Sequence, residues 1–297
     1  MRFVSSIASD VISDIQQSDQ SVQTALQQLS SGQRVSMPSD DPSASATMVQ
    51  LQAQGASIDQ YTANADSALS QAQDADSVLT SVVSLLNQAI TLGTEGATST
   101  TSTTDRQTLA TEVQGMLSNV VSLANTTFQG MSLFGGTSSS QTAFTADASS
   151  STGYTYTGNS GVNSIAVGDS LSVQANIPGD TLFTSSNASV LGALSSLSTA
   201  LTSGSSDDIS TATSAVTTAL NYVTQQHVVY GNTINQLTAQ ETYLASDTVT
   251  LTSRESSLVG IDTATAAEDV SQAETNNSAV LAASAKVLQT NLLTYLQ

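Results

Sequence analysis

Residues that could do acid–base or metal chemistry are few in this chain of 297 residues. The single histidine, His227, occupies a position in a long heptad pattern, where a lone imidazole is usually a core residue. One histidine cannot build a histidine-rich metal site, and no Ser/His/Asp set is credible around it. The chain has no cysteine, so disulfides and thiolate metal sites are excluded.

Three pairs of adjacent carboxylates are the other candidates for catalysis: Asp40–Asp41, Asp207–Asp208 and Glu268–Asp269. Neighbours in sequence point in different directions on a helix, so these pairs are poorly placed for general acid–base work. They suit helix starts, where the helix dipole favours negative charge. The glycine-containing turns match neither G-x-G-x-x-G nor the P-loop. The sequence therefore predicts no catalytic residue, cofactor or metal, and a protein that is not an enzyme.

Charge and hydropathy exclude further classes of partner. Five basic residues stand against 24 acidic ones, for a net charge of −19. The basic residues are scattered and form no stripe to meet phosphates, so we expect no nucleic-acid partner. No run of about 18 apolar residues is present, and the first residues lack the apolar core of a secretory leader. We therefore expect neither a membrane segment nor a cleaved signal.

A heptad pattern between Val216 and Leu258 predicts one long helix. Its seam, spaced alternately four and three residues apart, is Val216, Leu220, Val223, His227, Tyr230, Ile234, Leu237, Glu241, Leu244, Thr248, Leu251, Glu255 and Leu258. At ~1.5 Å rise per residue such a helix is about 60 Å long, so it needs partner helices of similar length.

Similar seams at both ends of the chain supply those partners. The first helix is predicted to end at Ser31–Gly32, and the second to begin with Asp41 as N-cap and Pro42 as its first residue. Its seam slips by one position between Ile58 and Tyr61. We expect a loop over 93–103, then a third helix opened by a capping box of Thr104 and Gln107. The last helix, about 263–295, carries two neighbouring seams, so it should contact more than one partner.

The pattern changes to period two over 137–186, which predicts a few short strands. Gly168–Asp169 suits a type II′ hairpin turn. The predicted fold is mainly α: a long antiparallel helical bundle or coiled coil formed by both chain ends, with a small β-rich insertion. We expect three parts: a terminal coiled-coil domain of 1–32 with 261–297, a helical rod domain of 33–136 with 187–260, and the insertion at 137–186.

A loop sequence links this pattern to a known family. Residues 29–42, LSSGQRVSMPSDDP, resemble the LSSG-x-R-V-x-x-PSDDP signature of the flagellin superfamily, and the PSDDP form is typical of its branch at the hook–filament junction. The signature residues of the loop are Arg34, Pro38, Ser39, Asp40, Asp41 and Pro42. Further motifs follow in the family's order: Asp105–Arg106, the LANT and FGGT sequences near 123–137, YTGNSG at 156–161, and the ending NLLTYL at 291–296.

The resemblance implies a structural subunit of the bacterial flagellum without enzymatic activity or cofactor. Such subunits leave the cell through the flagellar type III export apparatus, are held by an export chaperone at the C-terminal helix, and assemble outside the cell. The implied partners are further copies in a helical array, other hook-associated proteins and flagellin. The terminal helices would form the assembly interface through Val4, Val11, Ile15, Val22, Leu29, Val270, Val280, Leu281, Val287, Leu288, Leu292 and Tyr295.

Two alternatives stay open at this point. A short flagellin that builds the filament itself would carry the same motifs. An intracellular coiled-coil scaffold would carry the same heptads without being exported. Physically, all of these roles start from amphipathic terminal helices, which are marginally stable alone and gain stability when their seams are buried between neighbours.

Overall fold

The computed structural model describes residues 2–186 and 188–295, with side chains described over 9–186 and 188–287. The chain divides into two compact units. One comprises Met1–Ser57 and Asp247–Gln297, and the other Ile58–Ser246. The first boundary falls beside the predicted slip in the seam of the second helix. The three-part division expected from the sequence stays a prediction.

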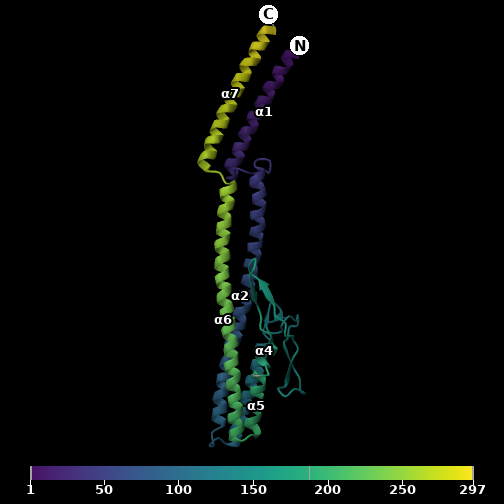
Figure 1. Ribbon diagram of the computed structural model, residues 1–297, viewed down its shortest axis with the longest axis vertical. Helices are drawn as coiled ribbons and strands as arrows, with labels where there is room; N and C mark the ends of the chain where they lie inside the picture. Colours follow the sequence, from purple (N-terminus) through teal and green to yellow (C-terminus); the bar gives the residue numbers. More distant parts are fainter. Residues whose placement is uncertain (1, 187, 296–297) are drawn as a thin grey trace. The chain divides into compact units, whose positions relative to one another are not determined.

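The fold is mainly helical, as predicted, with short strands between the third and fifth helices (Figure 1). The helices are α1 Arg2–Ser31, α2 Pro42–Gly96, α3 Thr103–Ala124, α4 Gly179–Phe183, α5 Val190–Ser203, α6 Ser206–Val259 and α7 Thr263–Tyr295. The strands are β1 Thr127–Phe128, β2 Met131–Ser132, β3 Phe144–Ala146, β4 Tyr154–Tyr156, β5 Ser164–Ala166 and β6 Ser172–Gln174.

The terminal unit contains α1 and α7 side by side and antiparallel (Figure 1), together with the first turns of α2 and the last turns of α6. Helix α1 ends as predicted, because Gly32 adopts a φ of 68° and its N–H donates to Gln28 O at 2.9 Å. Helix α2 begins as predicted, because Asp41 Oδ1 accepts from the N–H groups of Ser43 and Ala44. Gly55 of α2 lies close to α6, since a methyl group there would lie 3.1 Å from Leu251 Cδ2.

The unit Ile58–Ser246 has a core built by α2, α3, α5 and α6. Its fully buried side chains include Leu79 and Leu86 of α2 and Leu194 and Leu197 of α5. Burying one such side chain contributes about 1.5–3 kcal/mol. The seam predicted for α2 is confirmed here, where the residues in seam positions are buried or half-buried: Tyr61, Ala65, Ala68, Ala72, Ala75, Leu79, Val82, Leu86 and Ala89.

Polar residues interrupt the seam of α6. Glu241 is half-buried, and its Oε1 has no hydrogen-bond partner among the described residues. Burial raises the pKa of Glu241, and the nearby carboxylate of Asp66 raises it further. Thr248 is exposed, so the apolar contact of α6 is discontinuous.

Helix α2 extends beyond its predicted end. The expected loop at 93–103 begins only after Gly96, and both Gly93 and Gly96 are buried in the last turns of α2. A methyl group at Gly93 would collide with Thr213 Oγ1, and one at Gly96 with Leu201 Cδ2. These glycines therefore permit close helix packing, and the sequence-based interpretation of them as loop residues was wrong.

The start of α3 is capped two residues earlier than predicted. Ser102 is the N-cap, and its Oγ accepts from Asp105 N at 3.1 Å and contacts Asp105 Oδ2 at 2.7 Å. The predicted capping box of Thr104 and Gln107 is not formed, because both residues already lie within the helix.

Three separate two-stranded antiparallel hairpins follow α3. The β1–β2 hairpin precedes the predicted insertion, and β3–β4 and β5–β6 lie within it. The β5–β6 hairpin was predicted, with Ile165 opposite Val173. Its turn is not type II′: Gly168 is absent from the residues with positive φ, and three residues separate Val167 from Leu171, whose O accepts from Val167 N. Strands β1, β2 and β3 and the short helix α4 were not predicted.

Side chains from two helices hold the β5–β6 hairpin. Asn64 of α2 donates to Ala166 O at 2.8 Å, and Gln240 of α6 donates to Val167 O at 2.8 Å. Tyr61 donates its hydroxyl to Asp169 Oδ1 at 3.2 Å. The hairpin is therefore attached to the bundle by polar contacts to its turn.

An aromatic cluster fixes the rest of the insertion to the bundle. Phe183 packs edge-on against Phe134 and Phe144, with ring centroids 5.3 and 5.7 Å apart. The buried hydroxyl of Tyr230 on α6 accepts from Ile177 N at 3.0 Å, and burial raises the pKa of Tyr230 to about 12. The insertion thus shares its core with the helices, as its small size required.

One stretch of α2 is long and apolar enough to cross a membrane by length and mean hydropathy, which the sequence analysis did not anticipate. Its apolarity has another source. Alanine, valine and leucine residues of α2 between 65 and 89 form the helix face that packs into the bundle core. A bundle helix meets the same criterion, so we propose that α2 is such a helix.

Exchanging the two glycines Gly93 and Gly115 for alanine tests the packing of the last turns of α2. Gly93→Ala should destabilise the protein by about 1–3 kcal/mol, because the added methyl group displaces Thr213. The matched control Gly115→Ala, in α3, has no atom within 4 Å of the new methyl group and should gain up to about 1 kcal/mol from helix propensity. Urea unfolding followed by circular dichroism measures both. Equal changes in the two variants would show that Gly93 is not a packing site.

Candidate assembly interface

The antiparallel pair α1–α7 is the candidate site. The predicted seam residues of α1 face α7. Ala25 is buried, and Val11, Ile15, Val22 and Leu29 are half-buried. On α7, Val270 and Val280 are half-buried and Ser284 is buried. The side chains of Val4, Leu288, Leu292 and Tyr295 lie outside the described residues, so their predicted role stays a prediction.

Polar contacts set the register of the two helices. Asn277 Nδ2 donates to Asp19 Oδ1 at 2.6 Å near the middle of the pair. At its end, Gln33 and Gly260 form an antiparallel bridge, and Ile261 N donates to Gly32 O at 3.0 Å. These contacts tie the exit of α1 to the entry of α7 and fix which residues meet.

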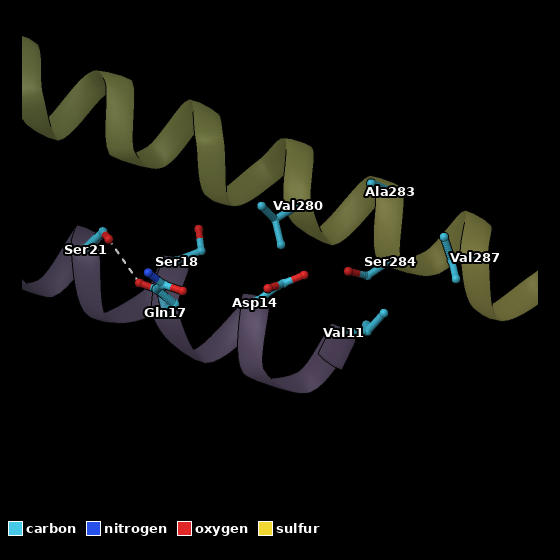
Figure 2. Close-up of a pocket in the computed structure, with 9 residues that line it drawn as sticks. All are labelled: Val11, Asp14, Gln17, Ser18, Ser21, Val280, Ala283, Ser284 and Val287. Carbon is cyan, nitrogen blue, oxygen red and sulfur yellow. Dashed lines mark hydrogen bonds between the residues drawn. The ribbon is translucent and has the colours of Figure 1, made fainter. Parts of the chain in front are cut away.

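Small side chains leave an open groove of about 410 Å³ between α1 and α7. Figure 2 shows Asp14 and Ser18 of α1 pointing towards α7, and Val280 and Ser284 pointing back towards α1. Serine and valine are too short to close the space between the two backbones. The pair is therefore loosely packed along this stretch.

Several apolar side chains of the pair are exposed. Leu281 is 49% exposed and Val287 39% exposed on α7, while Ile12 is 56% and Leu26 45% exposed on α1. Of the two seams predicted on α7, the row through Val270 and Val280 packs on α1, and the row through Leu281 faces outwards. Val287 was assigned to the inner row, and it lines the groove while remaining exposed.

The signature loop connects α1 with α2 and bonds to the end of α6. Arg34 N donates to Val259 O at 2.7 Å, and its Nη2 donates to Leu258 O at 3.2 Å. The same Nη2 lies 3.4 Å from Asp41 Oδ2, in a partly exposed ion pair. Beneath the loop, Val35 packs with Ala44 and Val259 in a small buried cluster. The loop therefore has a structural role: it connects α1 to α2 and attaches both to the end of α6.

The two aspartates of the signature have separate tasks. Asp40 Oδ2 accepts from Met37 N at 2.9 Å and Ser36 N at 3.1 Å, and these backbone bonds lower the pKa of Asp40. The pKa of Asp41 is lowered chiefly by the N–H of Ala44, which Asp41 caps. Pro42 takes the first helical position, where its missing N–H costs nothing. Pro38 and Ser39 are exposed in the turn.

His227 was predicted to lie in the core, but it does not. It is half-exposed, with Nε2 2.8 Å from Asp76 Oδ1 and 3.4 Å from Thr80 Oγ1. The imidazole contacts the carboxylate of Asp76 on α2 at the partly exposed edge of the packed face. Within the described part of the chain, no group of three or more His, Cys, Asp or Glu could hold a metal ion.

Comparisons with known proteins match the first half of the chain. Residues 5–139 match the family of the bacterial flagellin N-terminal helical region. The chain is 37% identical over 101 residues to flagellar hook-associated protein 3 of Escherichia coli, covering 34% of this chain and 32% of that protein. It is 29% identical over 126 residues to flagellin B of Helicobacter pylori, covering 42% and 24%. The chain thus spans about a quarter to a third of the length of these curated relatives.

A solved structure extends the likeness to most of the fold. The flagellar junction protein from Legionella pneumophila is similar with a TM-score of 0.58 and 17% identity, covering 72% of this chain and all of that one. At this identity the similarity supports a shared fold, including long helices from both chain ends.

Neutralising Asp40 should loosen the signature loop. The pKa of Asp40 is lowered in the fold, so its charge stabilises the loop above the ordinary value of 3.8, and the stabilisation is lost as pH falls through the lowered pKa. Asp40→Asn should therefore accelerate amide hydrogen exchange at Ser36 and Met37 at neutral pH. In the unmodified protein the same acceleration should begin only below pH 3.8.

The control is Asp10→Asn, a charge loss at an exposed position of α1 away from the loop. It should leave exchange at Ser36 and Met37 unchanged, as measured by nuclear magnetic resonance. If both variants exchange at the same rate, the carboxylate of Asp40 does not hold the loop.

Proposed function

We propose, from its resemblance to the flagellin superfamily and to flagellar hook-associated protein 3, that this chain is a structural subunit of the bacterial flagellum that assembles at the hook–filament junction. The carrying observation is the outward apolar row of the α1–α7 pair, exposed at Ile12, Leu26 and Leu281. A monomer leaves this surface in water, and neighbouring subunits would cover it.

The chemistry of packing supports assembly through the terminal helices. Covering apolar surface contributes about 25 cal/mol per Å², and each helix of the pair presents apolar residues on more than one face. Contacts between different faces of identical subunits propagate into a helical array when the rotation between neighbours does not close into a ring. The proposed interface comprises the outward row of both chain ends, because the predicted seam residues of α1 already face α7 within the chain. Other hook-associated proteins and flagellin would be the neighbours above and below.

A structural role accords with the acid–base groups of the described residues. The pKa of Asp147 is lowered to about 2 because the hydroxyls of Ser149 and Thr155 and the N–H of Ser149 donate to its carboxylate inside the β3–β4 hairpin. This stabilises a turn and prepares no proton for transfer. We propose that the protein has no enzymatic activity, leaves the cell through the flagellar type III apparatus, and is held before export by a chaperone at α7.

A second candidate is a short flagellin that forms the filament itself, which the match to flagellin B favours. Both candidates use the same terminal helices and differ in number of copies. Quantitative mass spectrometry of sheared flagella should find tens of copies of a junction protein and thousands of a filament protein. A protein confined to the cytosol would instead indicate an intracellular scaffold.

Placing a charge on the outward row tests the proposed interface. Leu281→Asp should leave the helix content unchanged, because the side chain is 49% exposed, and should abolish incorporation into flagella. Ala279→Asp is the matched control: it adds the same charge two residues earlier, on another face of α7, and should still assemble.

The measurement is immunoblotting of sheared flagella and of culture medium from cells that express each variant in place of the original chain. Leu281→Asp should accumulate in the medium, exported but not incorporated. Its incorporation at the level of the unmodified protein would contradict an assembly role for this row.

A further inference from the structure

A cavity of about 400 Å³ lies within the unit Ile58–Ser246. It opens between α2, the β1–β2 hairpin, the segment after β2 and strand β5. The volume is at the lower end of the range of about 300–1,000 Å³ that is usual for small-ligand sites.

The lining is polar but uncharged. It combines three amide side chains, Gln71, Gln129 and Asn163, with hydroxyls that include Ser67 and Ser164. Amides and hydroxyls donate and accept hydrogen bonds at the same time. An ionic ligand would lose its hydration in this cavity without meeting an opposite charge, which is costly. The chemistry therefore favours a neutral ligand with many hydroxyl groups.

Much of this hydrogen-bonding capacity is unused. The side chains of Gln71 and Ser67 are half-buried and that of Gln129 is exposed, and none of them forms a hydrogen bond with another described residue. Ser132 also lines the cavity, is only 7% exposed, and its Oγ is without a partner among the described residues. A buried hydroxyl without a partner costs about 1–3 kcal/mol. Because the Oγ of Ser132 is closed to solvent, the unused groups that a ligand can reach are those of Gln71, Gln129 and Ser67.

Apolar side chains complete the wall. Phe128 is half-buried and lines the cavity together with Leu133 and Ile165. A sugar ring carries hydroxyls at its edge and C–H groups on its faces, so it needs both kinds of surface. We infer that this cavity binds a neutral saccharide, one or two rings long, through the amide of Gln71 and the ring of Phe128. This inference is independent of the proposed assembly role.

Saturation-transfer nuclear magnetic resonance with the full-length chain tests the inference. The probes are neutral methyl glycosides of glucose, galactose, mannose and N-acetylglucosamine and the disaccharide maltose, with glucuronic acid and sialic acid as anionic comparators. At least one neutral probe should show saturation transfer at millimolar concentration, and the anionic sugars should show none. No transfer to any neutral sugar, or equal transfer to the anionic ones, would overturn the inference.

A pair of glutamines on α2 supplies the matched variants. Gln71→Ala removes an amide that lines the cavity, whereas Gln73→Ala removes an exposed amide that does not. Gln71→Ala should weaken binding about 5- to 10-fold, the loss expected for one hydrogen bond, while Gln73→Ala should bind as the unmodified protein does. Both variants should melt at the same temperature. An equal affinity in the two variants would place the saccharide elsewhere and refute the site.

Discussion

The terminal unit depends on the antiparallel pairing of α1 with α7. Each helix carries a narrow row of valine, alanine and serine residues, and a row of this kind is stable only against a partner row. The hydrogen bond from Asn277 to Asp19 and the bridge between Gln33 and Gly260 determine which residues meet. This register places the α7 row through Val270 and Val280 against α1. As a consequence, Leu281 faces outwards.

Close approach of helices, rather than large side chains, holds the unit Ile58–Ser246 together. Fully buried alanines such as Ala65, Ala68 and Ala72 lie on the face of α2 that packs inwards, and Gly93 and Gly96 continue that face at its end. Dispersion forces fall steeply with separation, so short side chains pack well only when backbones are near. This explains how a chain with 4% aromatic residues can form a core. The few aromatic residues gather where the insertion meets the helices.

Local signals made much of the fold predictable from the sequence. Gly32 and the Asp41–Pro42 pair end and begin helices through their own backbone preferences, and the heptad seams follow from period alone. The predictions were wrong where tertiary contacts, rather than local sequence, determine the secondary structure. Gly93 lies in a stretch with loop-like composition, yet Leu197 and Thr213 require a residue without a side chain there. Strands of two or three residues, such as β1 and β3, are too short to show a period, so only their partners reveal them.

The candidate interface was predictable in composition but not in orientation. Periodicity identified both rows of α7, whereas the row that packs on α1 depends on how the signature loop joins the helices, through Arg34 and the end of α6. Under the proposed role, the net charge of −19 opposes the burial of the outward row between copies. Salt at physiological strength screens such repulsion beyond about 8 Å, while the contact between apolar side chains is unaffected. The balance between separate and assembled subunits should therefore shift towards assembly as ionic strength rises.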